Sequence, residues 1–200
     1  MKINKSPQRL VLTLFFLTLL FFCFVTSITS KDLTAIVIDD KGKTYKVSDL
    51  YAKYTPHSGL WVVRPERVKK SLVIVLYVVE DRITFTKDLD ITFASMKRVI
   101  FQDAKVPENL QVFFKDKGKL ICIEMQDGSS VFLSGNLLIE IDAQDTQSQN
   151  IKIDRYLFAG EIQDKDVMLD GFGGRGKSAS GIEGDFWISL SETKSIEFDN

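Results

Sequence analysis

Residues 171–178 have glycine, lysine and serine at the spacing of a phosphate-binding loop. Gly171-Phe-Gly-Gly-Arg-Gly-Lys-Ser178 matches G-x-x-x-x-G-K-[ST] at every fixed position. In such a loop, backbone N–H groups surround the phosphates, the lysine contacts the terminal phosphates and the hydroxyl binds magnesium. The site also needs a helix directly after the loop, whereas residues 179–184 hold two glycines and a strand-like segment follows. The sequence therefore predicts no nucleotide site and no cofactor.

The same segment is rich in glycine. Six of the twelve glycines in the chain lie between Gly171 and Gly184, a composition typical of a long connection between strands. We expect a Gly-rich loop at 171–184. Because loops often carry binding residues, the candidate partner-contact residues are Phe172, Arg175 and Lys177.

Other reactive residue types do not complete a catalytic or metal site. Residues 191–194 fit S-x-x-K, but the S-D-N and K-T-G motifs that accompany it in acylating enzymes are absent from the sequence. His57, the only histidine, lies in a turn-like segment, and the absence of a G-x-S-x-G motif argues against a serine triad. One histidine and one cysteine in an apolar segment also argue against a zinc site. Residues 164–175 resemble a calcium loop, but Met168 and Arg175 occupy positions that need oxygen ligands. We expect no catalytic residue and no metal.

Three acidic residues leave an enzymatic alternative open. Glu161, Asp164 and Asp166 could supply the paired carboxylates of a glycoside hydrolase, although spacing in sequence does not give the separation in space that this chemistry requires. The leading hypothesis is an exported, non-enzymatic β protein that binds or scaffolds an unknown envelope protein or polymer. The alternatives are an envelope-polymer hydrolase and a membrane-anchored accessory subunit.

Residues 1–30 have the three parts of a secretory signal. Three basic residues precede the mainly apolar run Leu10–Val25, and small polar residues follow it. We predict a signal peptide that is cleaved after Ser27 or Ser30, and therefore a periplasmic or extracellular protein. The run has 16 residues, slightly fewer than the ~20 that cross a bilayer. An uncleaved anchor at residues 10–25 is the alternative, and only then is a membrane contact expected.

The charge of the exported part gives no reason to expect nucleic acid as a partner. Beyond residue 30 the chain has 23 basic and 27 acidic residues, a net charge of −4, and no basic stripe. The densest basic stretch, Arg64–Lys70, contains Glu66 and is interpreted as a solvated loop. Cys122 is the only cysteine in this part, so no internal disulfide can form. Its apolar neighbours predict a buried, unreactive thiol.

Short runs of β-branched and aromatic residues, separated by turn residues, predict an all-β fold. The runs are residues 34–38, 72–79, 110–114, 131–133 and 137–141. Asp40–Lys43, Asp116–Lys119 and Gln126–Gly128 each contain the glycine that a tight hairpin connection favours.

An internal repeat indicates how these strands are organised. Ile91–Phe101 aligns without gaps with Ile188–Phe198, and both follow Ile-[Thr/Ser]-[Phe/Leu]-x-x-x-Lys-x-[Val/Ile]-x-Phe. The alternation predicts strand, tight turn and strand, an order that resembles the closing element of small SH3-like barrels over eleven residues of each copy. We predict two tandem β-barrel or sandwich-like units, at 31–104 and 105–200, each with its last phenylalanine (Phe101 or Phe198) buried.

Overall fold

The computed structural model describes residues 33–56, 66–69, 71–80, 83–115, 120–135, 137–144, 148–161, 166–177 and 181–199. Most of these residues are in strands, so the all-β prediction is confirmed. Within these ranges no helix has the length and apolar composition needed to cross a membrane. The predicted signal or anchor segment lies outside the described residues.

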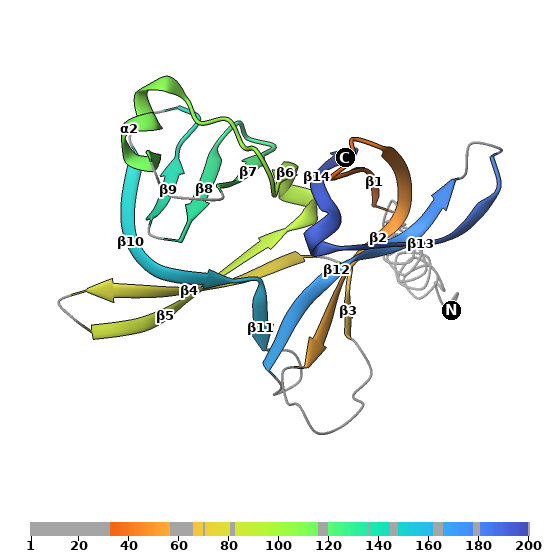
Figure 1. Ribbon diagram of the computed structural model, residues 1–200, viewed down its shortest axis with the longest axis horizontal. Coiled ribbons are helices and arrows are strands. Elements are labelled where there is room, and N and C mark those ends of the chain that lie inside the picture. Colours follow the sequence, from red (N-terminus) through yellow and green to blue (C-terminus); the bar gives the residue numbers. More distant parts are fainter. Residues whose placement is uncertain are drawn as a thin grey trace, which may run out of the picture. The chain divides into compact units, whose positions relative to one another are not determined.

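The strands and helices are distributed along the chain as follows (Figure 1). The strands are β1 (Thr34–Asp39), β2 (Thr44–Pro56), β3 (Glu66–Val68), β4 (Ser71–Glu80), β5 (Ile83–Thr92), β6 (Met96–Ile100), β7 (Ile121–Met125), β8 (Ser130–Ser134), β9 (Leu137–Ile141), β10 (Ser148–Leu157), β11 (Ala159–Glu161), β12 (Asp166–Lys177), β13 (Glu183–Ser189) and β14 (Thr193–Asp199). The short helices are η1 (Phe93–Ser95), η2 (Glu108–Leu110), α2 (Gln111–Phe114) and η3 (Leu190–Glu192).

All fourteen strands belong to one hydrogen-bonded sheet. Its order is β11-β12-β2-β1-β14-β6-β7-β8-β9-β10-β4-β5, with β13 beside β12 and β3 beside β2. The order contains two runs that meet at the β14–β6 ladder. One run is β13-β12-β2-β1-β14 and the other is β6-β7-β8-β9-β10-β4-β5. In each run the two end strands are joined along the chain by a 3₁₀ turn, η3 or η1.

The two predicted units, 31–104 and 105–200, are not confirmed. Residues Leu33–Asn200 form one compact unit, and the proposed boundary falls between β6 and β7, which pair with each other. The first run combines strands from the beginning and the end of the chain, while the second is formed by the segment between them. One run is therefore inserted into the other, and they are not in tandem.

The internal repeat, in contrast, is confirmed in detail. Both copies fold as strand, 3₁₀ turn and strand: β5-η1-β6 and β13-η3-β14. The two closing strands pair antiparallel, with Val99 opposite Ile196. These two residues also correspond in the sequence alignment, so the copies are related by a local two-fold axis through this pair. Phe101 and Phe198 are both buried, as predicted.

One hydrophobic core lies between the two runs. It contains Val99 and Ile196 from the shared ladder, and it extends to Leu76 in one run and Phe172 in the other. Tyr54 of β2 is fully buried, and its hydroxyl accepts a hydrogen bond from the backbone N–H of Val73 in β4 at 3.0 Å. Burial raises the pKa of this tyrosine to about 12. Because the core is continuous, we expect both runs to unfold together.

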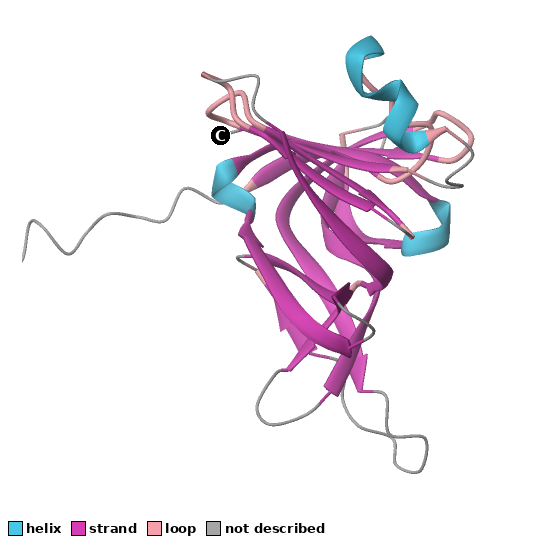
Figure 2. Ribbon diagram, turned by 90° about the vertical axis from the view of Figure 1, so that its left-hand side faces the viewer, coloured by secondary structure: helices cyan, strands magenta, loops and turns pink. Residues whose placement is uncertain are grey.

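A second, smaller cluster lies under the short helices. Figure 1 shows α2 above β8 and β9, and Figure 2 shows the helices outside the strands. Residues 110–114, predicted to be a strand, form the end of η2 and all of α2. Leu110 is buried and Phe114 half-buried, while Val112 and Phe113 are exposed. This spacing of four residues is helical, so the apolar composition of the segment misled the strand prediction. Cys122 is buried in the same cluster, as predicted.

Two of the three predicted hairpin turns are confirmed. Gly42 connects β1 and β2 with φ of 80°, and Gly128 connects β7 and β8 with φ of 87°. Both conformations favour glycine. The third turn, at 116–119, lies outside the described residues.

Candidate functional site

A hollow in the described surface lies on strands β3, β2, β12 and β13, which are neighbours in that order. Its volume is about 520 Å³. Charged and aromatic side chains line most of it, and we call it the Trp187 groove. The lining residues are Asp49, Tyr51, Lys53, Arg67, Lys69, Gly174, Arg175, Asp185, Phe186 and Trp187.

Four glycines of the predicted loop lie in strand β12, and one of them, Gly174, lines this groove. Residues 171–177 belong to strand β12, which pairs with both β2 and β13, so the prediction of a loop was wrong for this part of 171–184. Gly173 lies opposite both Tyr51 and Trp187. A side chain at Gly173 would overlap the Tyr51 ring, and one at Gly174 would overlap Val47 and the Ser48 carbonyl. The glycines are therefore needed for close packing and not for a phosphate-binding turn.

Two aromatic rings in the groove each lie against a cation. The Lys53 Nζ atom is 4.5 Å from the centre of the Trp187 ring, and the Arg67 guanidinium carbon is 4.9 Å from that of Tyr51. Trp187 remains 46% exposed. The lysine also lies 3.9 Å from the Asp170 carboxylate, which holds it over the ring. These contacts fix the position of an indole ring that is still half-exposed and accessible to a ligand.

The groove is positively charged although the chain is not. Four cationic and two acidic side chains line it, a balance of +2, whereas the whole chain has a net charge of −1. Arg175 lies 4.0 Å from Asp49 in an exposed, weak ion pair. Among the described residues, Arg67 and Lys69 have no carboxylate at ion-pair distance. The groove can therefore accept negative charge from outside.

The three residues predicted to contact a partner lie in different environments. Arg175 lines the groove. Phe172 is 1% exposed in the core, with its ring 5.6 Å from that of Phe101, so it cannot contact a partner. Lys177 lies outside the groove lining and pairs with Glu183 at 3.4 Å. Of this set, only Arg175 remains a candidate.

Most of the groove was missed by sequence reasoning. Arg67 belongs to strand β3, and Lys69 follows it, so the solvated loop expected at 64–70 is wrong at 66–68. On β2, Tyr51 and Lys53 are half-buried while Ala52 and Tyr54 are buried. This alternation, together with an aromatic and a cation on the same face, was a signal that could have identified the groove.

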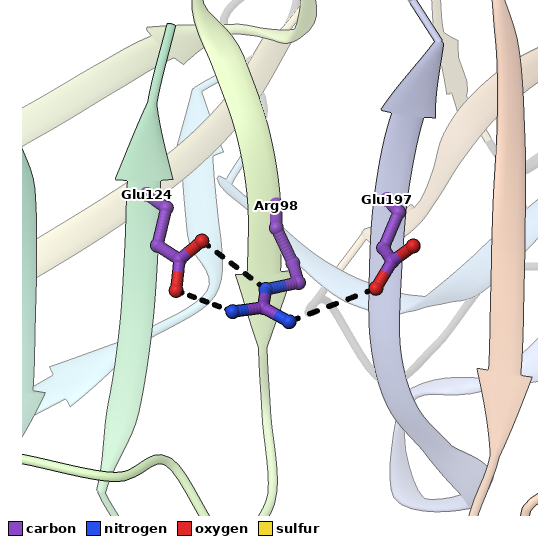
Figure 3. Close-up of polar contacts among 3 residues, drawn as sticks. All are labelled: Arg98, Glu124 and Glu197. Carbon is purple, nitrogen blue, oxygen red and sulfur yellow. Dashed lines mark hydrogen bonds and ion pairs between the residues drawn. The ribbon is translucent and has the colours of Figure 1, made fainter. Parts of the chain in front are cut away.

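A second polar cluster joins the two runs of strands. Arg98 lies between Glu124 on β7 and Glu197 on β14 (Figure 3). Two of its nitrogens donate to Glu124 at 2.6 and 3.2 Å, and the third lies 3.7 Å from Glu197. The hydrogen bond with Glu124 and both carboxylate charges raise the pKa of Arg98. Its charge is already matched, so we assign it a structural role.

Several predicted residues lie where the structure gives no side-chain information. His57 and Asp164 are outside the described residues, and the side chains of Glu161 and Asp166 are not described either. The S-x-x-K match is the 3₁₀ turn η3 and the start of β14, as the strand-turn-strand prediction requires. Burial raises the pKa of the Cys122 thiol to about 12, so it is unreactive at neutral pH.

Comparison with protein-family models, with curated proteins and with solved structures gave no match to this chain. The residues of the groove are therefore the basis for a proposed function.

Proposed function

We propose that this chain is an exported, non-enzymatic protein that binds an envelope component through the Trp187 groove. One observation carries the proposal: a half-exposed tryptophan, held by Lys53, lies in a positively charged hollow on a negatively charged chain. Tryptophan, tyrosine and arginine supply most of the energy at binding surfaces, and this groove contains all three. The composition of residues 1–30 supports export.

The architecture supports a binding role as well. We propose that each run of strands is a barrel-like unit, since a 3₁₀ turn joins its first strand to its last. The groove belongs to the unit formed by β13-β12-β2-β1-β14, and Arg98 and the shared core hold that unit against the other. A rigid sheet positions side chains more accurately than a loop does. The inserted unit thus stabilises the strands that carry the groove, because it packs against β14, the last strand of their unit.

The export part of the proposal has a direct test. Intact-mass measurement of the protein recovered from the envelope fraction should show a chain that begins near Ile28 or Lys31. A chain that still begins at Met1 would contradict cleavage and favour the membrane-anchored form.

Co-sedimentation with isolated envelope tests the binding part. The exported form of the protein should sediment with envelope material, and Trp187→Ala should weaken that binding about 30-fold, as for a residue that contributes about 2 kcal/mol. The matched control is Phe113→Ala, which removes an exposed aromatic side chain on α2 outside the groove. Equal sedimentation of all three proteins, or none by the wild type, would refute binding through the groove.

A further inference from the structure

We infer that the ligand of the Trp187 groove is an acidic peptide segment of a partner protein, bound in an extended conformation. This inference rests on the proposed function and specifies the chemistry of the ligand. Its basis is the arrangement of charge around the two aromatic rings.

The cations of the groove lie on three adjacent strands. Arg67 on β3 is opposite Lys53 on β2, whereas Arg175 on β12 is opposite Ser48, four residues along β12 from the residue that pairs with Lys53. Residues along a strand are about 3.3 Å apart and neighbouring strands about 4.8 Å apart, so an extended acidic segment of several residues can span the distance from Arg67 to Arg175. Lys53 is committed to Asp170 and to the indole ring. Arg67, Lys69 and the weakly paired Arg175 are the groups left to receive carboxylates.

A peptide fits this groove better than a uniformly charged polymer. Asp49 and Asp185 both lie beside Arg175, the first at 4.0 Å from its guanidinium and the second opposite it on β13, and they would repel a chain that carries a negative charge on every unit. In an extended peptide every second side chain faces the groove, and these side chains can differ from one another, so acidic residues can meet the cations where neutral ones lie against the aspartates. Arginine also binds carboxylates through two parallel hydrogen bonds. The half-exposed Trp187 ring adds an apolar contact for a side chain of the peptide.

A second hollow limits how far an acidic segment can extend. It has a volume of about 350 Å³ and shares Asp185, Phe186 and Trp187 with the first. Its charged residues are Asp39, Asp40, Lys41, Asp185 and Glu192. With four carboxylates and one lysine, this hollow repels negative charge. The peptide must therefore become neutral or basic where it passes Trp187, which gives the complex a defined direction.

Synthetic peptides test the inference. Capped octapeptides (Glu-Thr)₄, (Gln-Thr)₄ and (Lys-Thr)₄ are titrated into the exported protein while the fluorescence of Trp187 is recorded. A Trp61→Phe background removes the only other tryptophan. The glutamate peptide should bind at least about tenfold more tightly than the glutamine peptide, because several exposed charge pairs add up. Its affinity should fall as salt is raised from 50 to 500 mM.

Charge reversal makes the test decisive. Arg67→Glu combined with Lys69→Glu should abolish the preference for the glutamate peptide and create one for the lysine peptide. The matched control, Lys177→Glu combined with Lys194→Glu, changes the net charge equally at residues that do not line the groove and should keep the glutamate preference. Unchanged preference in the groove variant would overturn the inference, as would equal affinity of the wild type for the glutamate and glutamine peptides.

A separate experiment compares an acidic peptide with an anionic polymer as the source of the negative charge. Poly(glycerol phosphate), an anionic polymer without peptide bonds, should bind more weakly than the glutamate peptide. Equal or tighter binding of this polymer would overturn the assignment to a peptide. If envelope binding depends on Trp187 but no acidic peptide binds, the inference fails and the proposed function stands. If neither occurs, both fail.

Discussion

Gly174→Ala tests whether the glycine-rich segment is a packed strand. A Cβ atom at residue 174 would lie 2.5 Å from Val47 Cγ1 and 2.6 Å from the Ser48 carbonyl oxygen. Ordinary van der Waals contact begins at about 3.4 Å, so each neighbour would have to move by nearly 1 Å. Val47 is fully buried and Ser48 lies in the β2 ladder. Neither atom belongs to the far end of a flexible side chain, and the backbone must therefore shift.

The expected cost follows from this overlap. Overpacking of a well-filled interior costs about 1–3 kcal/mol, and two contacts, one of them with backbone, place Gly174→Ala near the upper end. A loss of about 2–3 kcal/mol corresponds to a melting temperature about 4–12 °C lower for a chain of this size. Thermal and urea unfolding, followed by circular dichroism, measure the change.

Gly184→Ala is the matched control for this substitution. Gly184 lies on β13 opposite Gly176, and a Cβ atom added there would have no other atom within 4 Å, so the methyl group enters open space. Restricting the unfolded chain should then leave stability unchanged or raise it by up to about 1 kcal/mol. If Gly174→Ala proved as mild as Gly184→Ala, the packed-strand interpretation would be refuted and a loop at 171–184 would again be the better description.

Three further predictions concern the core, the β1–β2 turn and the phosphate-loop match. Phe101→Ala and Phe198→Ala should each cost about 3–5 kcal/mol in urea unfolding, whereas Lys194→Ala should cost less than about 0.5 kcal/mol; similar values would contradict the shared closing ladder. Burial raises the pKa of the Asp39 carboxyl group, but hydrogen bonds from the Lys43 and Lys41 N–H groups and the Tyr45 hydroxyl lower it by a larger amount. The pKa of Asp39 therefore lies below its ordinary value of 3.8. The ionised Asp39 thus stabilises the fold at pH values above 3.8, and this stabilisation is lost as the pH falls through the lowered pKa. Asp39→Asn should therefore lose less stability than the wild type between about pH 4 and lower pH. An unchanged dependence of stability on pH below about 4 would refute this. ATP with magnesium should not raise the melting temperature, and a rise abolished by Lys177→Ala would restore the nucleotide interpretation.

Much of the local structure could be predicted because local sequence determines it. The repeat at 91–101 and 188–198 alternates apolar residues on both sides of a short turn, and both copies have the predicted strand, 3₁₀ turn and strand. The glycine turns at Gly42 and Gly128 follow from a backbone conformation that glycine favours.

The arrangement of the strands could not be predicted from these patterns. Pairing between β1 and β14, at opposite ends of the described sheet in sequence, depends on long-range contacts that periodicity does not encode. The tandem hypothesis assumed that strands close in sequence pair in space. In the structure, the strands of the second run lie in sequence between the first and the last strands of the first run.

The groove was missed for a related reason. Its residues come from four strands, and the segment that contributes Gly174 and Arg175 was interpreted as a loop because glycine is rare inside strands. The structure shows that Gly173 is opposite Tyr51 and Trp187. The glycine leaves room for the Tyr51 ring, which is distant in sequence, so the local sequence could not reveal this contact. Phe172 lies between Gly171 and Gly173 in sequence, so its neighbours did not indicate burial and its position in a presumed loop suggested exposure.

Site-specific photo-crosslinking tests the central claim most directly. A photoreactive amino acid replaces Lys69, which is exposed at the groove, or Lys97, which is exposed on β6 and does not line it. After illumination of intact cells that produce the protein, we expect a discrete crosslinked product from position 69 and none of the same mass from position 97. The same product from both positions, or no product from position 69, would contradict binding through the Trp187 groove.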